Sequence, residues 1–162
     1  MLPCSLRETN LYPSLVLALR DMRTANGRDP ATGEGGGNDS WIGLTMGMIV
    51  LDSLTGRGDV GKRWTRLLTV RGVSPEDATI IYELRCSLLH GYGIPRAEAV
   101  FGRRVVLTAD RDAYAVDTAT PDLALVSVPV FCGGLVERIA AEVPNDWDVS
   151  RIDTNYTVVR PE

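Results

Sequence analysis

The only histidine of the chain, His90, stands close in sequence to other side chains that could take part in acid–base chemistry. It lies in the stretch ELRCSLLHGYG, five positions after Arg85 and two positions before Tyr92. A guanidinium offers planar, paired donors that match the oxygens of a phosphate. An imidazole titrates near neutral pH and can therefore take up or release a proton. Together these two groups suit metal-independent chemistry on a phosphate ester.

The spacing of Arg85 and His90 constrains how the two side chains can cooperate. Successive residues of a helix turn by about 100°, so residues five apart point roughly 140° away from each other. We therefore expect the pair not to meet within one straight helix. Either the helix end unwinds at Gly91, or a second copy of the chain brings its own pair alongside.

Each of these residues also has an ordinary structural interpretation. His90 can be a cation favoured at a helix C-terminus, and Tyr92 can be an aromatic side chain at the edge of the core. Arg85 can form an ion pair with a nearby acid, for which the candidates are Glu76, Asp77 and Glu83.

The pattern Arg85-x(4)-His90-x-Tyr92 resembles the R-x(4–6)-H motif of the HEPN superfamily, which lies late on a helix of a small helical bundle. The resemblance implies a dimeric, metal-independent endoribonuclease of a toxin, phage-defence or CRISPR system. Arg85 would bind the scissile phosphate and stabilise the transition state, and His90 would assist proton transfer as the ribose 2′-OH attacks. The implied product ends are a 2′,3′-cyclic phosphate and a 5′-hydroxyl.

The resemblance assigns further roles around the motif. Ser87 and Cys86 would support the catalytic pair, and Tyr92 would be an AMPylation target in toxins that have a nucleotidyltransferase antitoxin. An antitoxin or another defence-system protein is the implied partner. The residue after the arginine is usually Asn, Asp or His in active members, whereas here it is Cys86, a weaker hydrogen-bonding group.

That departure favours a second hypothesis, a catalytically inactive HEPN-like module that binds RNA, a nucleotide or a partner protein. A third is an unrelated helical domain in which the motif is accidental.

The charge distribution predicts where RNA would bind. The chain has 17 basic and 21 acidic residues and a net charge of -4, so no overall positive field attracts nucleic acid. Basic side chains are concentrated locally, and we expect an RNA-binding segment that contains Arg57, Lys62, Arg63 and Arg66. The alternative interpretation is a solvated helix face.

The sequence predicts neither a metal site nor a cofactor. Its three cysteines form no C-x-x-C pair, and one histidine cannot complete a zinc site. Asp110 and Asp112 are typical of a turn. Cys86 and His90, four apart on one helix face, could form a thiol nucleophile with its base, but we favour a buried structural thiol. No leader or run of about 18 apolar residues is present, which predicts a cytoplasmic protein without a membrane segment.

The helical elements are predicted from apolar spacing and capping residues. We expect one domain over residues 1–162, of mostly α class (α+β), organised as a HEPN-like helical bundle. Its helices are expected over Leu11–Ala25, from a cap at Asp39 or Ser40 through Leu54, over Lys62–Val70, and from Ser74 to Gly91. The glycine-rich segment 27–39 is expected to be a flexible loop, and Gly43 and Gly47 should allow a neighbouring element to approach closely.

Residues 102–130 are predicted to be a β insertion before the last long helix. RRVVLTA and AYAVDT, on either side of residues 110–112, indicate an antiparallel hairpin. LALVSVPV indicates a third strand, which Pro129 would place at an edge or bring to its end. Helical spacing returns through Leu135, Ile139 and Val143, and YTVV in the tail has weak strand character.

Overall fold

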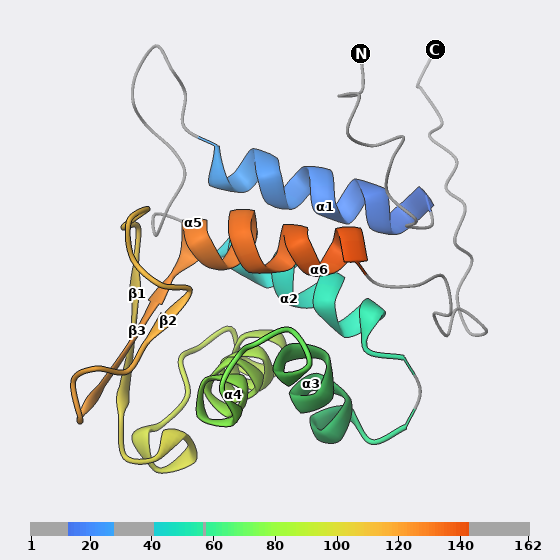
Figure 1. Cartoon of the computed structure of the whole chain (residues 1–162). Helices are drawn as coiled ribbons and strands as arrows, with labels where there is room; N and C mark the ends of the chain where they lie inside the picture. The colour runs from blue at the N-terminus through green and yellow to red at the C-terminus, as the bar shows by residue number, and fades with distance from the viewer. Residues whose placement is uncertain (1–12, 28–40, 57, 143–162) are drawn as a thin grey trace.

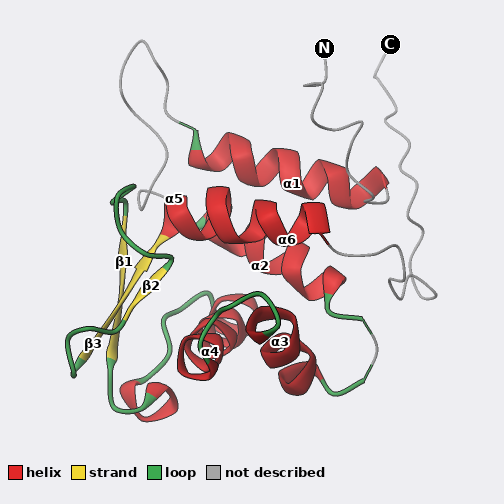
Figure 2. Ribbon diagram, viewed as in Figure 1, coloured by secondary structure: helices red, strands yellow, loops and turns green. Residues whose placement is uncertain are grey.

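The computed structural model describes residues 13–27, 41–56 and 58–142. Most of these residues are helical, and a small mixed sheet lies at one side of the helices (Figures 1 and 2). The expectations that concern the loop at 28–39, the caps Asp39 and Ser40, Val143 and the YTVV tail fall outside the described residues.

The predicted helices are confirmed, with small changes at their ends. They are α1 (Pro13–Asn26), α2 (Ile42–Leu54), α3 (Val60–Thr69) and α4 (Pro75–Gly91). The last helix is continuous from α5 (Val128–Val130) through η4 (Phe131–Val136), which is π-helical, to α6 (Glu137–Glu142). Figure 1 shows α1, α2 and this last helix together, with α3 and α4 below them.

Helix starts follow local capping chemistry where a polar cap is present. The Ser74 hydroxyl accepts a hydrogen bond from the Asp77 amide at 3.0 Å and Pro75 occupies the first turn, as predicted for α4. Asp59 caps α3 by accepting from the Lys62 amide at 3.0 Å. The start of α2 is different, because its N-cap, Trp41, makes no side-chain capping bond.

The core between α1, α2 and the last helix depends on a close approach at Gly47. A Cβ atom at this position would lie 3.3 Å from the Met22 sulfur and 3.4 Å from side-chain atoms of Cys132 and Val136. Gly43 also lies beside η4, because its carbonyl accepts a hydrogen bond from the Cys132 thiol at 3.6 Å, but this contact does not depend on the absence of a side chain. The predicted close approach is therefore confirmed at Gly47, where the approaching elements are α1 and η4, and it stays a prediction at Gly43.

The predicted hairpin is wrong. The sheet has the order β1-β3-β2, so β1 (Arg104–Thr108) and β2 (Val116–Asp117) are not neighbours. β3 (Leu123–Ser127) lies between them, parallel to β1 and antiparallel to β2. The buried residues Ala124 and Val126 give β3 an apolar character that suits a central strand. Of the two alternatives for Pro129, the edge position is wrong and the end of the strand is confirmed, because β3 ends at Ser127 and Pro129 lies in the first turn of α5.

A single arginine connects the sheet to α4. The Arg103 guanidinium lies 2.9 Å from the Glu76 carboxylate on α4 and donates to the carbonyls of Thr120 and Pro121 at 2.7 Å each. Its side chain is 15% exposed. Arg103 therefore holds the loop before β3 against the first turn of α4. The short helix η3 (Ala97–Val100) lies between α4 and β1 along the chain.

We predict that Gly47→Val destabilises the fold by about 1–3 kcal/mol, because the added side chain overpacks the contact among α1, α2 and η4. Gly133→Val is the matched control, since a Cβ at Gly133 meets no atom of the described residues within 4 Å. Urea denaturation of both variants measures the difference. Equal stabilities would show that the close approach at Gly47 tolerates a side chain.

Candidate functional site

Three helices meet at the carboxylate of Asp52, near the end of α2. Its Oδ2 lies 2.9 Å from Nη2 of Arg85 on α4. Its Oδ1 accepts a hydrogen bond from the indole nitrogen of Trp64 on α3 at 2.8 Å. Trp64 is fully buried, which fixes one side of the carboxylate. The position of the Arg85 guanidinium is thus set by two other helices and not by α4 alone.

Arg85 and His90 lie next to each other within one chain. Nη1 of Arg85 is 3.4 Å from Nε2 of His90, although α4 continues without interruption to Gly91. The expectation that the two side chains would not meet within one helix is therefore wrong. The Cα–Cβ bonds of the two residues still point in different directions, but the arginine side chain is long enough to reach the histidine ring. In this orientation the guanidinium can donate to an unprotonated ring nitrogen.

The Arg85 guanidinium is largely buried, and its side chain is only 11% exposed. Burial is the largest single influence on its pKa and lowers it, but the hydrogen bond and charge of Asp52, with a smaller contribution from Cys86, raise the pKa overall. Nε of Arg85 is buried and has no hydrogen-bond partner among the described residues. The site therefore holds a permanent cation whose hydrogen-bonding capacity is not fully used.

The ion pair that the sequence suggested for Arg85 is formed with a different residue. The candidates were Glu76, Asp77 and Glu83, all near in sequence, whereas the partner is Asp52, 33 residues away. Glu76 instead binds Arg103. Asp52 was missed because a carboxylate that follows an apolar helical run has no local signal that identifies its partner. Only the packing of α2 against α4 brings the two charges together.

Cys86 and Ser87, the two residues expected to support the catalytic pair, point in different directions from α4. Cys86 is half-buried, with its sulfur 3.9 Å from Nη1 of Arg85. Its thiol also forms a hydrogen bond with Tyr82, which, together with burial, raises the pKa of Tyr82. Ser87 is on another side of the helix, and its carbonyl accepts a hydrogen bond from the Gly93 amide at 3.1 Å. In the described part of the chain its hydroxyl makes no hydrogen bond to Arg85 or His90.

Tyr92 ends α4 in a backbone conformation that is uncommon for a residue with a side chain. Its φ is 47° and its ψ is 48°, in the left-handed region, and the residue before it, Gly91, is the last residue of the helix, as predicted. Its ring is 56% exposed and lies 5.3 Å from the ring of Trp41, at the start of α2. Tyr92 is thus a surface residue and not an aromatic side chain at the edge of the core.

The basic segment is only partly available to a ligand. Lys62 and Arg66 are exposed and one turn apart on α3. Arg63 is half-buried and donates to the carbonyl of Gly56. Arg57 lies outside the described residues. The exposed cations of α3 that lie in this segment are therefore Lys62 and Arg66.

Asp110 and Asp112 have the turn role expected of them. The Asp112 amide donates to Oδ1 of Asp110 at 2.9 Å, and the Asp110 amide donates to the Thr108 hydroxyl. Within residues 13–27, 41–56 and 58–142, no three His, Cys, Asp or Glu side chains are grouped so as to hold a metal ion. None of the helices in these ranges combines the length and apolar character that crossing a bilayer requires.

Comparison with known proteins finds no relative whose site could be set beside this one. The chain matches no family model, no curated protein and no solved structure.

We predict that Asp52→Asn lowers the free energy of unfolding by about 1–2 kcal/mol, because Arg85 would remain largely buried without its counter-charge. The matched control is Asp21→Asn, which removes an ion pair with Arg20 whose two side chains are about half exposed. Such a pair contributes at most about 1 kcal/mol. Chemical denaturation compares the two variants, and a smaller loss for Asp52→Asn than for Asp21→Asn would contradict the central position of Asp52.

Proposed function

We propose that this protein is a metal-independent endoribonuclease of the HEPN type, and that it acts in a toxin or phage-defence system. The observation that carries the proposal is the contact of 3.4 Å between Nη1 of Arg85 and Nε2 of His90. The motif by itself left these groups on different sides of a helix. Their proximity provides a cation for a phosphate and a proton-transfer group beside it.

The chemistry requires each side chain in a different role. Nη1 of Arg85 would donate to a non-bridging oxygen of the scissile phosphate, where negative charge increases in the transition state. His90 would transfer a proton during attack by the ribose 2′-OH on the phosphorus, which expels the 5′-oxygen of the next nucleotide. Asp52 is a positioning residue, because it holds Nη2 of Arg85 at 2.9 Å and would not touch the RNA.

The surface beside the site supports a homodimer. Two contacts, Trp41 with Tyr92 and Asp52 with Arg85, align α2 antiparallel to the second half of α4. Between them, α2 presents apolar side chains to solvent at helical spacing, and Ile42 and Ile49 are 56% and 38% exposed. Met46 lies between these two and is partly buried. A second copy that covered this stripe would bring two Arg85–His90 pairs near one interface.

We expect the purified protein to cleave RNA in the presence of EDTA and to leave 2′,3′-cyclic phosphate and 5′-hydroxyl ends. Arg85→Ala and His90→Ala should each lower the rate at least about a hundredfold, since each removes a group that acts in the transition state. Gel analysis of RNA fragments, with enzymatic end-group tests, provides the measurement.

Arg96→Ala is the matched control for loss of a positive charge, because Arg96 is exposed and lies after the end of α4. Its activity should equal that of the unaltered protein. Cleavage that persists in both motif variants would reject the proposed site, and cleavage that requires a divalent cation would reject the mechanism.

A second candidate function, an inactive module that binds RNA, is favoured by two features of the same site. Asp52 neutralises one side of the Arg85 guanidinium, and Cys86 provides only a weak contact at 3.9 Å. Fluorescence anisotropy with a labelled oligoribonucleotide separates the hypotheses. Binding without cleavage, weakened by loss of Lys62 and Arg66, would replace the ribonuclease with this module.

We predict that the protein is a dimer in solution and that Ile49→Asp shifts it towards the monomer, because a charge would be buried at the contact. Val70→Asp is the control, since Val70 is 67% exposed at the end of α3 and lies outside the α2 stripe. Light scattering coupled to size-exclusion chromatography gives the mass of each variant. A monomeric unaltered protein would contradict the dimer.

A further inference from the structure

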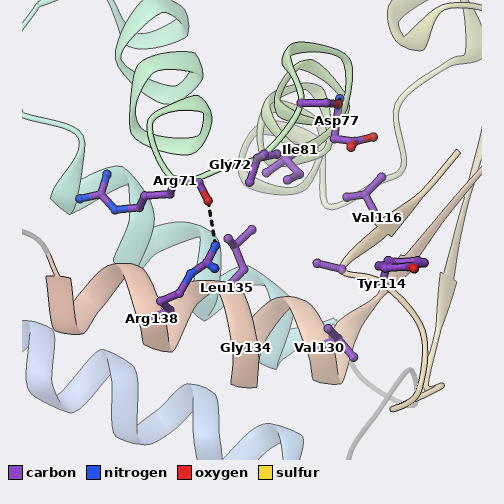
Figure 3. Close-up of a pocket in the computed structure, with 13 residues that line it drawn as sticks. Arg71, Gly72, Asp77, Ile81, Tyr114, Val116, Val130, Gly134, Leu135 and Arg138 are labelled. Carbon is purple, nitrogen blue, oxygen red and sulfur yellow. Dashed lines mark hydrogen bonds between the residues drawn. The ribbon is translucent and has the colours of Figure 1, made fainter.

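A cleft of about 660 Å³ lies away from the Arg85–His90 pair. Its walls come from the turn after α3, the first half of α4, the segment that leads into β2, and the last helix (Figure 3). Asp77 lines this cleft on α4 and is 13 residues before His90, which corresponds to about 20 Å along a helix. The cleft is therefore a separate feature of the molecule, with a volume in the range of small-molecule sites.

The inner surface of the cleft is apolar. Ile81 and Leu135 are buried behind it, and Val116 lies opposite them on β2 (Figure 3). Gly134 leaves part of the wall without a side chain, and a Cβ atom there would meet only Val130, at 3.8 Å. This glycine belongs to the π-helical stretch η4, a form of backbone that is often found at functional sites. The cleft can therefore accept an apolar group against the helix backbone.

One end of the cleft has an arginine that is available to a ligand. Arg138 is exposed, and Nη2 donates to the backbone carbonyl of Arg71 at 3.1 Å, which directs its guanidinium towards the cleft (Figure 3). Arg71 also lines the cleft, but its side chain points away in Figure 3 and its Nε lies 3.4 Å from the Glu142 carboxylate. Arg138 thus provides the positive charge at this end, where it can bind a carboxylate.

The other end has a carboxylate that lacks a donor. Oδ1 of Asp77 is buried and accepts no hydrogen bond from the residues that the structure describes. The Asp77 side chain as a whole is only partly buried and lines the cleft, so its carboxylate offers negative charge to a ligand that enters this end. An anionic ligand is not expected here. Glu76 and Asp77 give the first turn of α4 negative charge, and Ser74 already accepts from the Asp77 amide.

We propose that this cleft binds a small apolar zwitterion, and specifically a short apolar peptide with both ends free. Its ammonium group donates to Asp77, its carboxylate accepts from Arg138, and its apolar side chains cover Ile81, Val116 and Leu135. The opposite charges at the two ends, the apolar surface between them and the open wall at Gly134 carry this inference. It is independent of ribonuclease activity.

The test is calorimetric titration of the full chain with leucyl-leucine and leucyl-leucyl-leucine, each compared with its N-acetylated and C-amidated forms. We expect binding of at least one free peptide. Blocking either end should weaken it about tenfold, the effect of one charge-assisted hydrogen bond. No binding of either free peptide at millimolar concentration would overturn the proposal.

Protein variants assign each charge to its end of the ligand. Arg138→Gln should weaken binding of the free peptide about tenfold and leave that of the amidated peptide within twofold. Asp77→Asn should weaken binding of the free peptide about tenfold and leave that of the acetylated peptide within twofold. Equal losses for free and blocked peptides would mean that the two residues act only on the structure, which would overturn the assignment.

Space in the cleft is tested separately from charge. Gly134→Leu should abolish binding by filling the open wall, whereas Gly133→Leu, at the neighbouring exposed glycine outside the cleft, should have no effect. His90→Ala should bind the peptide normally. Binding that survives Gly134→Leu, or that is lost in His90→Ala, would place the ligand elsewhere and reject the cleft.

Discussion

The carboxylate of Asp52 is the interaction on which the arrangement of the helices around the motif depends. It accepts from the buried indole of Trp64 and pairs with the nearly buried guanidinium of Arg85, so α2, α3 and α4 share one hydrogen-bonded centre. A buried cation without this partner would carry a desolvation cost of several kcal/mol. The same pairing leaves Nη1 of Arg85 facing His90. The stability of the helix junction and the geometry of the candidate site therefore have one physical origin.

Features with a local cause could be predicted from the sequence. The start of α4 follows from Ser74 and Pro75, and the burial of α1 follows from the spacing of Leu15, Leu19 and Met22, all of which are at most 2% exposed. These predictions depend on interactions within a few residues of the chain. The same is true of the turn at Asp110 and Asp112, whose hydrogen bonds join residues two positions apart.

Features set by distant segments could not be predicted in this way. The partner of Arg85 is 33 residues away, and the neighbour of β1 is β3 and not the adjacent strand β2. Alternation of apolar residues identifies a strand but gives no information about which strand will lie beside it. The contact between Arg85 and His90 was missed for another reason, because the angular spacing describes Cβ directions and the guanidinium lies several bonds beyond Cβ.

The parallel pairing of β1 with β3 also has a consequence for the order in which the chain folds. Arg104 is paired with Leu123, so the ladder between β1 and β3 needs closure of a longer loop than the antiparallel ladder between β2 and β3, in which Asp117 is paired with Leu125. Non-local pairing of this kind slows folding, while helices form from contacts close in sequence. We therefore expect the α4 helix, with its arginine and histidine, to form before the ladder between β1 and β3. Within the described residues β2 pairs with β3 alone, so the wall of the cleft that β2 provides depends on β3.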